Sequence, residues 1–525
     1  MTHRPMRWRL FGMVCGLACG LQMFAVDARA AEPKPAAEPR GRVIYNLDCS
    51  ELFVGTFGPV APQTIDSFVD THADAGITDL FINVNAQRTN YRSQVWESNW
   101  DGYDPTAGDD QPFFSGIDPK RMFETQFAKS VLSLHKQGCD YPRRMLARAR
   151  HNKVQAWISI RMNDSHYPDR PTHPFHSTFW RTHPQWHLSN KGLDYEQPEV
   201  RAHYMKLIRE ICSRYDVDGI ELDFLRFWLY FRPGREHSGT RLMQDFIKQV
   251  RTATSTAEQR LGHPVQLAVR VPGVPWIARR HGLDAVAWAR AGLVDLIVAG
   301  SFWSSVNTDI PVETWKGLLI GTNVDVAIHL EDGINSGASG RRTMTHGEMR
   351  GVLCSGLHRG ADAVYFFNLF TGPYQRWPRK DHDRLLTDAG SFSTLRSSAR
   401  RHPLSVTSPW SLGAPGASTA LPYTGQHAVF RTHVGPKPKP RQVAEIELVV
   451  TGSDQPPQVS LNGIPCPWSR RAKPKHIAAS GWKGQGQEAR DVYAVPAEAI
   501  SDGYNLIEAV ASQAMTITWV EIAIR

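Results

Sequence analysis

Two carboxylate side chains stand two residues apart in an apolar segment, since Glu221 and Asp223 both lie within residues 218–226. On a β-strand this spacing places both on one face, while the aliphatic residues between them face the other way. A buried carboxylate is costly unless it is paired, hydrogen-bonded or used in chemistry. The pair therefore indicates either an acid/base site at a strand end or a structural ion network with Arg161 or Arg226.

Short apolar segments alternate with longer helical patterns along residues 42–400. The eight expected strands are 42–49, 79–86, 154–163, 219–227, 265–271, 296–303, 326–331 and 363–370. This strict alternation predicts an α/β fold, a (β/α)8 TIM barrel, with an open doubly wound sheet as the alternative. Catalytic groups of such barrels lie at the C-terminal strand ends, so the long segments 87–120 and 164–197 should cover the site.

The strand face opposite the aliphatic residues carries polar side chains that could converge at that end. We expect three catalytic carboxylates, Glu221, Asp223 and Glu331. The expected substrate-binding residues are Asn83, Asn85, Arg161, Asn163, Asp164, Arg226, Trp228, Trp303 and His329.

Aromatic side chains follow the same strands, and flat rings such as those of Trp276 and Tyr374 could pack against sugar rings. Packing under loops is the alternative for about half of these aromatics. Arg270 and Asn368 are weaker candidates, because both faces of their strands are nearly apolar.

The segment after the third expected strand is rich in histidine: His166, His173, His176, His183 and His187. Their spacing fits no zinc motif, so we expect a surface loop. The acidic residues between 101 and 110 likewise lack the order of a calcium loop. We therefore expect no metal site and no cofactor.

The first thirty residues match a cleavable secretory signal, with arginines before an apolar run at 10–26 and small residues around Ala30. A lipid anchor at Cys19 is a less favoured alternative, because Gly16 stands where a large aliphatic residue is expected. No other stretch is long enough for a membrane span. We expect a signal peptide at 1–30, a flexible leader at 31–41, and an exported protein, either periplasmic or extracellular.

The formal net charge of +9 is mild for 525 residues. No block of lysine and arginine with interleaved aromatics predicts a nucleic-acid partner. The five cysteines beyond the expected signal peptide are far apart and odd in number, which indicates neither a disulfide framework nor a zinc motif.

The alternation stops near residue 401. Residues 401–423 are rich in Pro, Ser, Gly and Thr and are expected to form a linker. Beyond them, residues 424–525 hold short strands with turn signals at Asn462-Gly463 and Asp502-Gly503. These features predict a small all-β sandwich that supplies no catalytic group.

Two stretches carry a resemblance to a known group: Ser-Ile-Arg-Met-Asn-Asp-Ser-His at 159–166 and Val-Asp-Gly-Ile-Glu-Leu-Asp-Phe at 217–224. They resemble glycoside-hydrolase-like TIM-barrel proteins of a family-10-like bacterial group. The resemblance covers roughly residues 42–400, and the C-terminal part resembles the accessory domains attached to such barrels. It implies a carbohydrate substrate.

Better understood barrel families sharpen this resemblance. Retaining glycosidases place the acid/base on strand four and the nucleophile on strand seven, and Glu221 and Glu331 match these positions. In those enzymes an asparagine usually precedes the strand-four glutamate, whereas Ile220 precedes Glu221 here. Family 18 barrels resemble residues 218–223, but Leu225 occupies the position of their last catalytic glutamate.

The leading hypothesis is an exported glycoside hydrolase that acts on a poly- or oligosaccharide by a two-carboxylate, retaining mechanism. In it Glu221 protonates the leaving oxygen, Glu331 attacks the anomeric carbon, and Asp223 orients the sugar or shares a proton with Glu221. The alternative is a carbohydrate-binding protein without turnover on a degenerate barrel. The sequence leaves the sugar, the linkage and the oligomeric state open.

Overall fold

The structure, a computed structural model, describes residues 40–53, 60–118, 122–301, 306–336, 340–371, 377–405, 421–475 and 487–525. The expected signal peptide and almost all of the leader lie outside these ranges. The same holds for two aromatic residues expected near the site, Trp303 and Tyr374.

Eight parallel strands close into a barrel in the order β1-β10-β7-β6-β5-β4-β3-β2. They are β1 (Arg42–Leu47), β2 (Asp79–Asn83), β3 (Gln155–Arg161), β4 (Gly219–Asp223), β5 (Gln266–Pro272), β6 (Leu296–Gly300), β7 (Asp325–Leu330) and β10 (Ala363–Phe367). The predicted (β/α)8 barrel is thereby confirmed, since a closed ring of strands excludes the open sheet.

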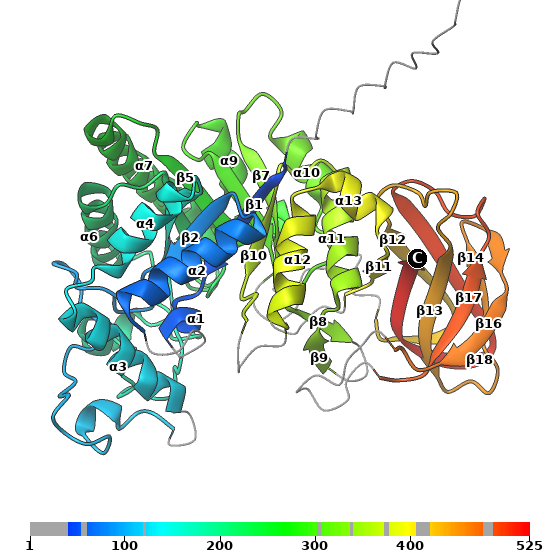
Figure 1. Cartoon of the computed structure of the whole chain (residues 1–525), viewed down its shortest axis with the longest axis horizontal. Helices are drawn as coiled ribbons and strands as arrows, with labels where there is room; N and C mark the ends of the chain where they lie inside the picture. Colours follow the sequence, from blue (N-terminus) through cyan, green and yellow to red (C-terminus); the bar gives the residue numbers. More distant parts are fainter. Residues whose placement is uncertain are drawn as a thin grey trace, which may run out of the picture. The chain divides into compact units, whose positions relative to one another are not determined.

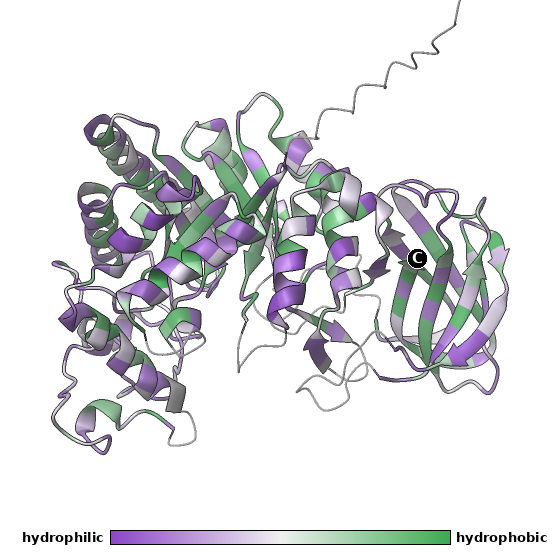
Figure 2. Cartoon of the chain, viewed as in Figure 1, coloured by the Kyte–Doolittle hydropathy of each residue, from purple (hydrophilic) through white to green (hydrophobic). Residues whose placement is uncertain are grey.

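Helices follow the strands and surround them (Figure 1). They are α1 (Cys49–Phe53), α2 (Pro62–Ala75), α3 (Met122–Lys136), α4 (Tyr141–His151), α5 (Thr178–Thr182), α6 (Pro198–Arg214), α7 (Glu236–Leu261), α8 (Pro275–Arg280), α9 (Ala285–Arg290), α10 (Val312–Leu318), α11 (His346–His358), α12 (Arg379–Ala389) and α13 (Phe392–Ser397). Hydrophobic residues concentrate on the barrel strands, whereas the helices carry both kinds (Figure 2). This distribution follows from strands that are buried on both faces and helices that bury one stripe.

Most of the barrel strands end earlier than the sequence pattern predicts. The segment 79–86 was expected to be a strand, yet β2 ends at Asn83. Beyond it, the side chain of Asn85 accepts a hydrogen bond from the Arg161 N–H at 3.0 Å and donates one to the Arg161 carbonyl at 3.0 Å. A side-chain amide therefore replaces the backbone ladder there, and the polar residues after the strands belong to the βα loops.

The lower part of the barrel interior is apolar and tightly packed. Phe81 stacks on Trp157 with ring centroids 4.6 Å apart. Gly219 faces them, and a Cβ there would lie 2.3 Å from the Trp157 ring. At the N-terminal end of the barrel, Arg42 pairs with Asp79 at 2.7 Å. This apolar layer separates the Arg42–Asp79 pair from the polar side chains toward the C-terminal strand ends.

An all-β domain follows the barrel in the chain. Its strands are β11 (Arg400–Pro403), β12 (Tyr423–His433), β13 (Ala444–Thr451), β14 (Gln458–Leu461), β15 (Ile464–Cys466), β16 (Trp468–Ala472), β17 (Arg490–Val495) and β18 (Tyr504–Ile524). The predicted all-β fold is confirmed. The first residues of the expected linker, 401–403, lie in β11, which pairs with β18.

The longest strand, β18, organises this domain. It is 21 residues long and pairs with β11, β12, β13 and β14. The sequence pattern predicts two strands here, at 505–510 and 516–524, and the structure joins them. A further hairpin that the pattern did not predict, β8 (Gly333–Ser336) with β9 (Gly340–Thr343), follows β7.

Within the described ranges, no helix combines the length and the apolar character that a bilayer span requires. Four cysteines, Cys139, Cys212, Cys354 and Cys466, are free thiols.

Candidate active site

Glu221 occupies the centre of the barrel interior on β4 and is fully buried. Its Oε2 accepts three hydrogen bonds, from Ser159 Oγ at 2.5 Å, Tyr365 OH at 3.0 Å and Asn46 Nδ2 at 3.2 Å. Its Oε1 has no hydrogen-bond partner among the described residues. One carboxyl oxygen is thus held in place while the other is left to interact with another group.

Burial, together with the neighbouring charge of Asp223, raises the pKa of Glu221 to about 7. Arg270 and the hydrogen bonds from Ser159 and Tyr365 act in the opposite direction. Near neutral pH a large fraction of Glu221 is therefore a carboxylic acid. A carboxyl group in that state can donate a proton.

Asp223 forms a bidentate ion pair with Arg270, at 2.9 Å from Oδ1 to Nε and 2.8 Å from Oδ2 to Nη2. Each side chain is 1% exposed. The two residues are register partners on adjacent strands, which aligns the guanidinium with the carboxylate. The ion network that the sequence left open therefore exists for Asp223, but its cation is Arg270 rather than Arg161 or Arg226.

His329 on β7 lies on the other side of Arg270, with its Nε2 3.3 Å from Nη1. Burial lowers the pKa of His329 well below its usual range, and the charge of Arg270 adds to this, so the ring is neutral. Its Nδ1 has no hydrogen-bond partner in the described part of the chain. The ring occupies space that Gly300 leaves open, because a Cβ there would lie 2.4 Å from Nδ1.

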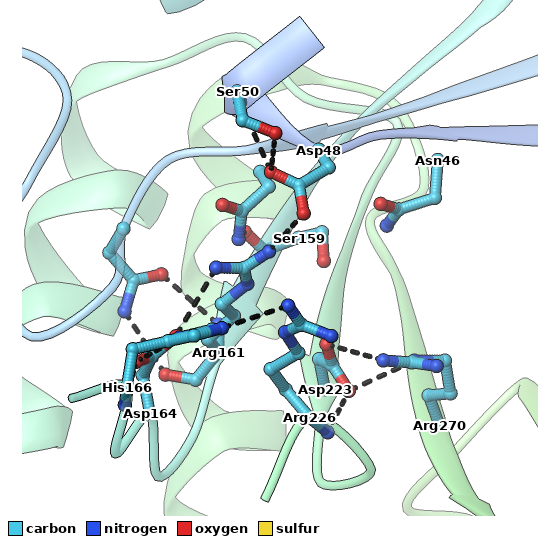
Figure 3. A network of polar contacts seen from close by, with 12 residues as sticks. Asn46, Asp48, Ser50, Ser159, Arg161, Asp164, His166, Asp223, Arg226 and Arg270 are labelled. Atoms are coloured by element: carbon cyan, nitrogen blue, oxygen red, sulfur yellow. Dashed lines mark hydrogen bonds and ion pairs between the residues drawn. The ribbon is translucent and has the colours of Figure 1, made fainter. Parts of the chain in front are cut away.

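A second charged cluster surrounds Arg161 (Figure 3). Arg161 donates to Asp48 at 2.6 Å and to Asp164 at 3.2 Å. His166 lies between Asp164, 2.7 Å from its Nδ1, and the Arg226 guanidinium, 2.9 Å from its Nε2. The cluster joins the loops after β1, β3 and β4 at the C-terminal end of the barrel.

The cluster holds its carboxylates in the charged form. Burial opposes the charge on Asp48, but Arg161 and Arg226 outweigh it and lower the pKa of Asp48 to about 2. For Asp164, burial is likewise outweighed by His166 and the arginines, which keep its pKa well below the usual range. Glu221 thus differs from Asp48 and Asp164 in having a raised pKa, a property that it shares with Glu51 after β1.

Glu331 directly follows β7 and is 1% exposed. Arg341 approaches it with 3.8 Å between Nη2 and Oε2, while the same guanidinium contacts Asp332 at 2.7 Å. The charge of Glu331 also acts on Arg226, which stands after β4. Glu331 therefore belongs to the same polar end of the barrel as the Arg161 cluster.

The other expected binding residues lie at this end, but several already have structural partners. Asn83 donates to the Ser159 carbonyl at 3.4 Å. The side chain of Asn163 exchanges hydrogen bonds with the backbone of Leu193 and donates to Leu229 O at 2.7 Å. Asn85 bridges β2 and β3 as described above. These amides fix the loops that frame the site.

Trp228 is half-buried after β4 and packs edge-on against the His281 ring, with centroids 4.7 Å apart. Trp276 is 54% exposed at the start of α8. Trp303 cannot be placed, because it lies outside the described residues.

Sequence reasoning missed several members of the site: Asn46, Asp48, Ser159 and Tyr365, and it ranked Arg270 too low. Asn46 and Asp48 stand two residues apart at the end of the first strand, the same alternation that identified Glu221 and Asp223. That parity could have found them.

The expectation of a surface loop for the histidines after β3 is wrong for two of them. His173 and His176 are fully buried. His176 stacks on Trp180 and His173 on Tyr167, with centroids 3.9 and 4.0 Å apart. Aromatic stacking therefore gives these rings a packing role. In the described ranges, no cluster of His, Cys, Asp and Glu side chains is arranged to hold a metal ion.

No protein-family model matches the chain, and no curated protein matches its sequence. Solved structures with a similar fold include α-L-fucosidase isoenzyme 2 from Paenibacillus thiaminolyticus, at 13% identity and a TM-score of 0.40. That match covers 68% of this chain and 49% of the fucosidase chain, which is less than two thirds of its length.

Two further matches are an α-amylase from Geobacillus thermoleovorans and the PgaB glycoside hydrolase domain from Bordetella bronchiseptica. The amylase has 11% identity and a TM-score of 0.35, with 92% of this chain and 98% of that chain covered. The PgaB domain has 11% identity and a TM-score of 0.38, with 67% and 99% covered. These solved neighbours are glycoside hydrolases, and at such low identity the likeness is one of fold.

Proposed function

We propose that the protein is a glycoside hydrolase in which Glu221 donates a proton to the leaving oxygen of an O-glycosyl bond. The observation that carries this proposal is a buried carboxyl group with a pKa of about 7, held through one oxygen by three donors. A general acid must be protonated at the working pH and must present a fixed oxygen to the substrate. Glu221 meets the first requirement, and its Oε1, which has no hydrogen-bond partner among the described residues, is the oxygen proposed for the second.

In the proposed reaction Glu331 is the second carboxylate. As Glu221 transfers its proton to the departing alcohol, Glu331 attacks the anomeric carbon and forms a glycosyl ester. Glu221 then accepts a proton from water, which attacks the anomeric carbon and releases the sugar from Glu331. A separation of about 5 Å between the two carboxyl groups would support this retaining course, and about 6.5–9.5 Å would support inversion.

In this proposal the ion pair between Asp223 and Arg270 helps to set the pKa of Glu221. The charge of Asp223 acts on Glu221 and favours the protonated form of Glu221. The charged and amide groups at the barrel end, among them Arg161 and Arg226, are suited to bind sugar hydroxyl groups.

The proposal includes export. Residues 1–30 have the pattern of a secretory signal, which would place the enzyme in the periplasm or outside the cell. The test is N-terminal sequencing of the protein from the periplasmic and extracellular fractions of an expression host. A mature terminus near Ala31 is expected, and an intact Met1 in the cytoplasm would contradict export.

A second candidate function is carbohydrate binding without turnover. The observation that favours it is burial: Glu221 is 0% exposed and Glu331 is 1% exposed. A catalytic acid must contact its substrate. A barrel whose carboxylates remain inaccessible to the substrate would bind sugar without hydrolysing it.

One experiment separates the two functions. The protein from Ala31 onward is screened against a panel of neutral and acidic polysaccharides, with reducing-sugar detection and parallel binding measurements. Hydrolysis that Glu221→Gln abolishes while binding persists would support the enzyme. Binding without hydrolysis by the unaltered protein would support the second candidate.

The matched control is Glu51→Gln. Glu51 is also buried and its pKa is also raised to about 7, but it bonds Tyr45 and the Thr371 backbone. Its replacement is expected to leave hydrolysis within a few-fold of the unaltered enzyme, because no step of the proposed reaction uses it.

A further inference from the structure

A cavity of about 420 Å³ lies in the all-β domain, beside the sheet edge formed by β16. Six charged residues line it: Arg401, Glu447, Arg470, Lys473, Lys475 and Arg525. Five of the six are cationic. A cavity of this size is within the range that small ligands and single ligand groups occupy, roughly 300–1,000 Å³.

The inner charge of this cavity is fixed by buried ion pairs. Arg401 pairs with Glu447 at 2.6 Å and with Glu521. Arg490 pairs with the same two carboxylates, at 3.0 Å from Glu447. All four side chains are at most 9% exposed. Glu447 also pairs with Arg525 at 3.0 Å, so this network fixes the floor of the cavity and neutralises part of its rim.

The rim carries cations that are open to solvent. Arg470 and Arg525 share Glu445, at 2.9 and 2.7 Å, and are 44% and 43% exposed. Lys473 and Lys475 are exposed, and neither has an acidic partner within the described residues. Surplus positive charge around a concave surface raises the local concentration of anions.

Counting the rim and the floor together gives the charge of the site. The cations are Arg401, Arg470, Lys473, Lys475, Arg490 and Arg525, and the carboxylates are Glu445, Glu447 and Glu521. Arg490, Glu445 and Glu521 do not line the cavity but pair with residues that do. With these partners included, there are six positive and three negative groups, a surplus of three positive charges. Two of the surplus charges stand on Lys473 and Lys475.

We propose that this cavity binds the carboxylate or sulfate groups of an acidic polysaccharide. The preference for an anion rests on the surplus of cations around the cavity. The assignment of that anion to a polysaccharide rests on the proposed function of the barrel. If an acidic polysaccharide binds at this cavity, the β-domain would hold the polymeric substrate of the barrel.

The chain offers a matched pair of variants for the test. Lys473-Pro474-Lys475 lines the cavity, and Lys437-Pro438-Lys439 repeats the same three residue types, with both lysines exposed, elsewhere in the β-domain. The two double variants are Lys473→Ser with Lys475→Ser, and Lys437→Ser with Lys439→Ser. Each removes two exposed positive charges from a Lys-Pro-Lys segment.

The full-length mature protein and both variants are titrated at low salt with polygalacturonate, dextran sulfate, neutral dextran and single-stranded DNA. We expect the cavity variant to bind at least one acidic polysaccharide about ten-fold more weakly, since two exposed ionic contacts are lost. We expect the control variant to bind it as the unaltered protein does. The difference should shrink as salt is raised.

Three outcomes would overturn the proposal. Equal weakening in both double variants would show a general charge effect, and equal binding of neutral dextran would show that the anion is not recognised. Cavity-dependent binding of DNA that is tighter than binding of either polysaccharide would assign the cavity to nucleic acid. Because the titrations require no turnover, a protein that hydrolyses none of these polymers can still pass or fail this test.

Discussion

Replacement of Glu221 by Gln should change how the stability of the protein depends on pH. In the folded state burial and Asp223 hold the pKa of Glu221 at about 7, against an ordinary value of 4.5. The folded protein therefore binds more protons than the unfolded chain between these two pH values. Its free energy of unfolding falls as the pH rises through that window. A glutamine side chain cannot ionise, so the variant lacks this loss.

The size of the effect follows from the two pKa values. Each pKa unit between the folded and unfolded states corresponds to about 1.4 kcal/mol. From 4.5 to about 7, the carboxyl of Glu221 costs about 3 kcal/mol once the pH exceeds both values. Relative to the unaltered protein, the Glu221→Gln variant should therefore gain about 3 kcal/mol between about pH 4 and about pH 8.

The assay is urea unfolding of both proteins over this pH range, with the difference in unfolding free energy plotted against pH. Glu348→Gln serves as a control of opposite sign, because Arg342 holds the pKa of Glu348 below its usual range against the effect of burial. That variant should lose stability, relative to the unaltered protein, as the pH rises from acid to neutral. A flat difference curve for Glu221→Gln would refute the assignment of a protonated Glu221.

The remaining predictions concern the site and the β-domain. Asp223→Asn removes the charge that favours the proton on Glu221, so the alkaline limb of the pH–rate profile should move down by about one pH unit; an unchanged limb would count against the coupling. Glu521→Gln leaves two buried arginines with a weakened partner and should cost about 3–5 kcal/mol in chemical denaturation, whereas a loss below about 1 kcal/mol would show the network to be dispensable. In α11, a Cβ on Gly351 would lie 1.8 Å from a carbonyl oxygen of β11. Gly351→Ala should therefore lower the free energy of unfolding by about 1–3 kcal/mol, and the melting temperature with it. Gly317→Ala in α10, where a Cβ meets nothing within 4 Å, is its control and should be neutral or slightly stabilising.

The barrel could be predicted from the sequence because its pattern is local. Each strand is a short apolar run and each helix an amphipathic one, and a βα alternation that closes on itself leaves few topologies. The polar face of β4 was also predictable, since alternation alone placed Glu221 and Asp223 on one side.

The partners of those carboxylates depend on register and therefore could not be read from one strand. Asp223 meets Arg270 because the two are aligned across β4 and β5. Arg270 is the one charged residue of the apolar strand β5, so no alternation of polar residues along that strand indicates a functional role for it. Tyr365 reaches Glu221 from β10, 144 positions further along the chain. Only the closed barrel brings such groups together.

The strand ends and the histidine segment show a second limit. The sequence pattern extends the second strand through Ala86, but β2 ends at Asn83 and the side-chain amide of Asn85 forms the hydrogen bonds beyond it. Polar composition predicts a surface loop for His173 and His176, yet both are buried by stacking on aromatic rings. In each case a tertiary contact overrides the local preference.

The central claim is that Glu221 is the general acid, and its most direct test is the dependence of the rate on the leaving group. Once the substrate sugar is identified, kcat/KM is measured for the unaltered protein and for Glu221→Gln on the natural polysaccharide and on an aryl glycoside with an acidic phenol. The polysaccharide needs a proton on its leaving oxygen and the phenolate does not. We predict a loss of about 10²–10⁴-fold on the polysaccharide and a much smaller loss on the aryl glycoside. Equal losses on both substrates, or no loss on either, would contradict the assignment.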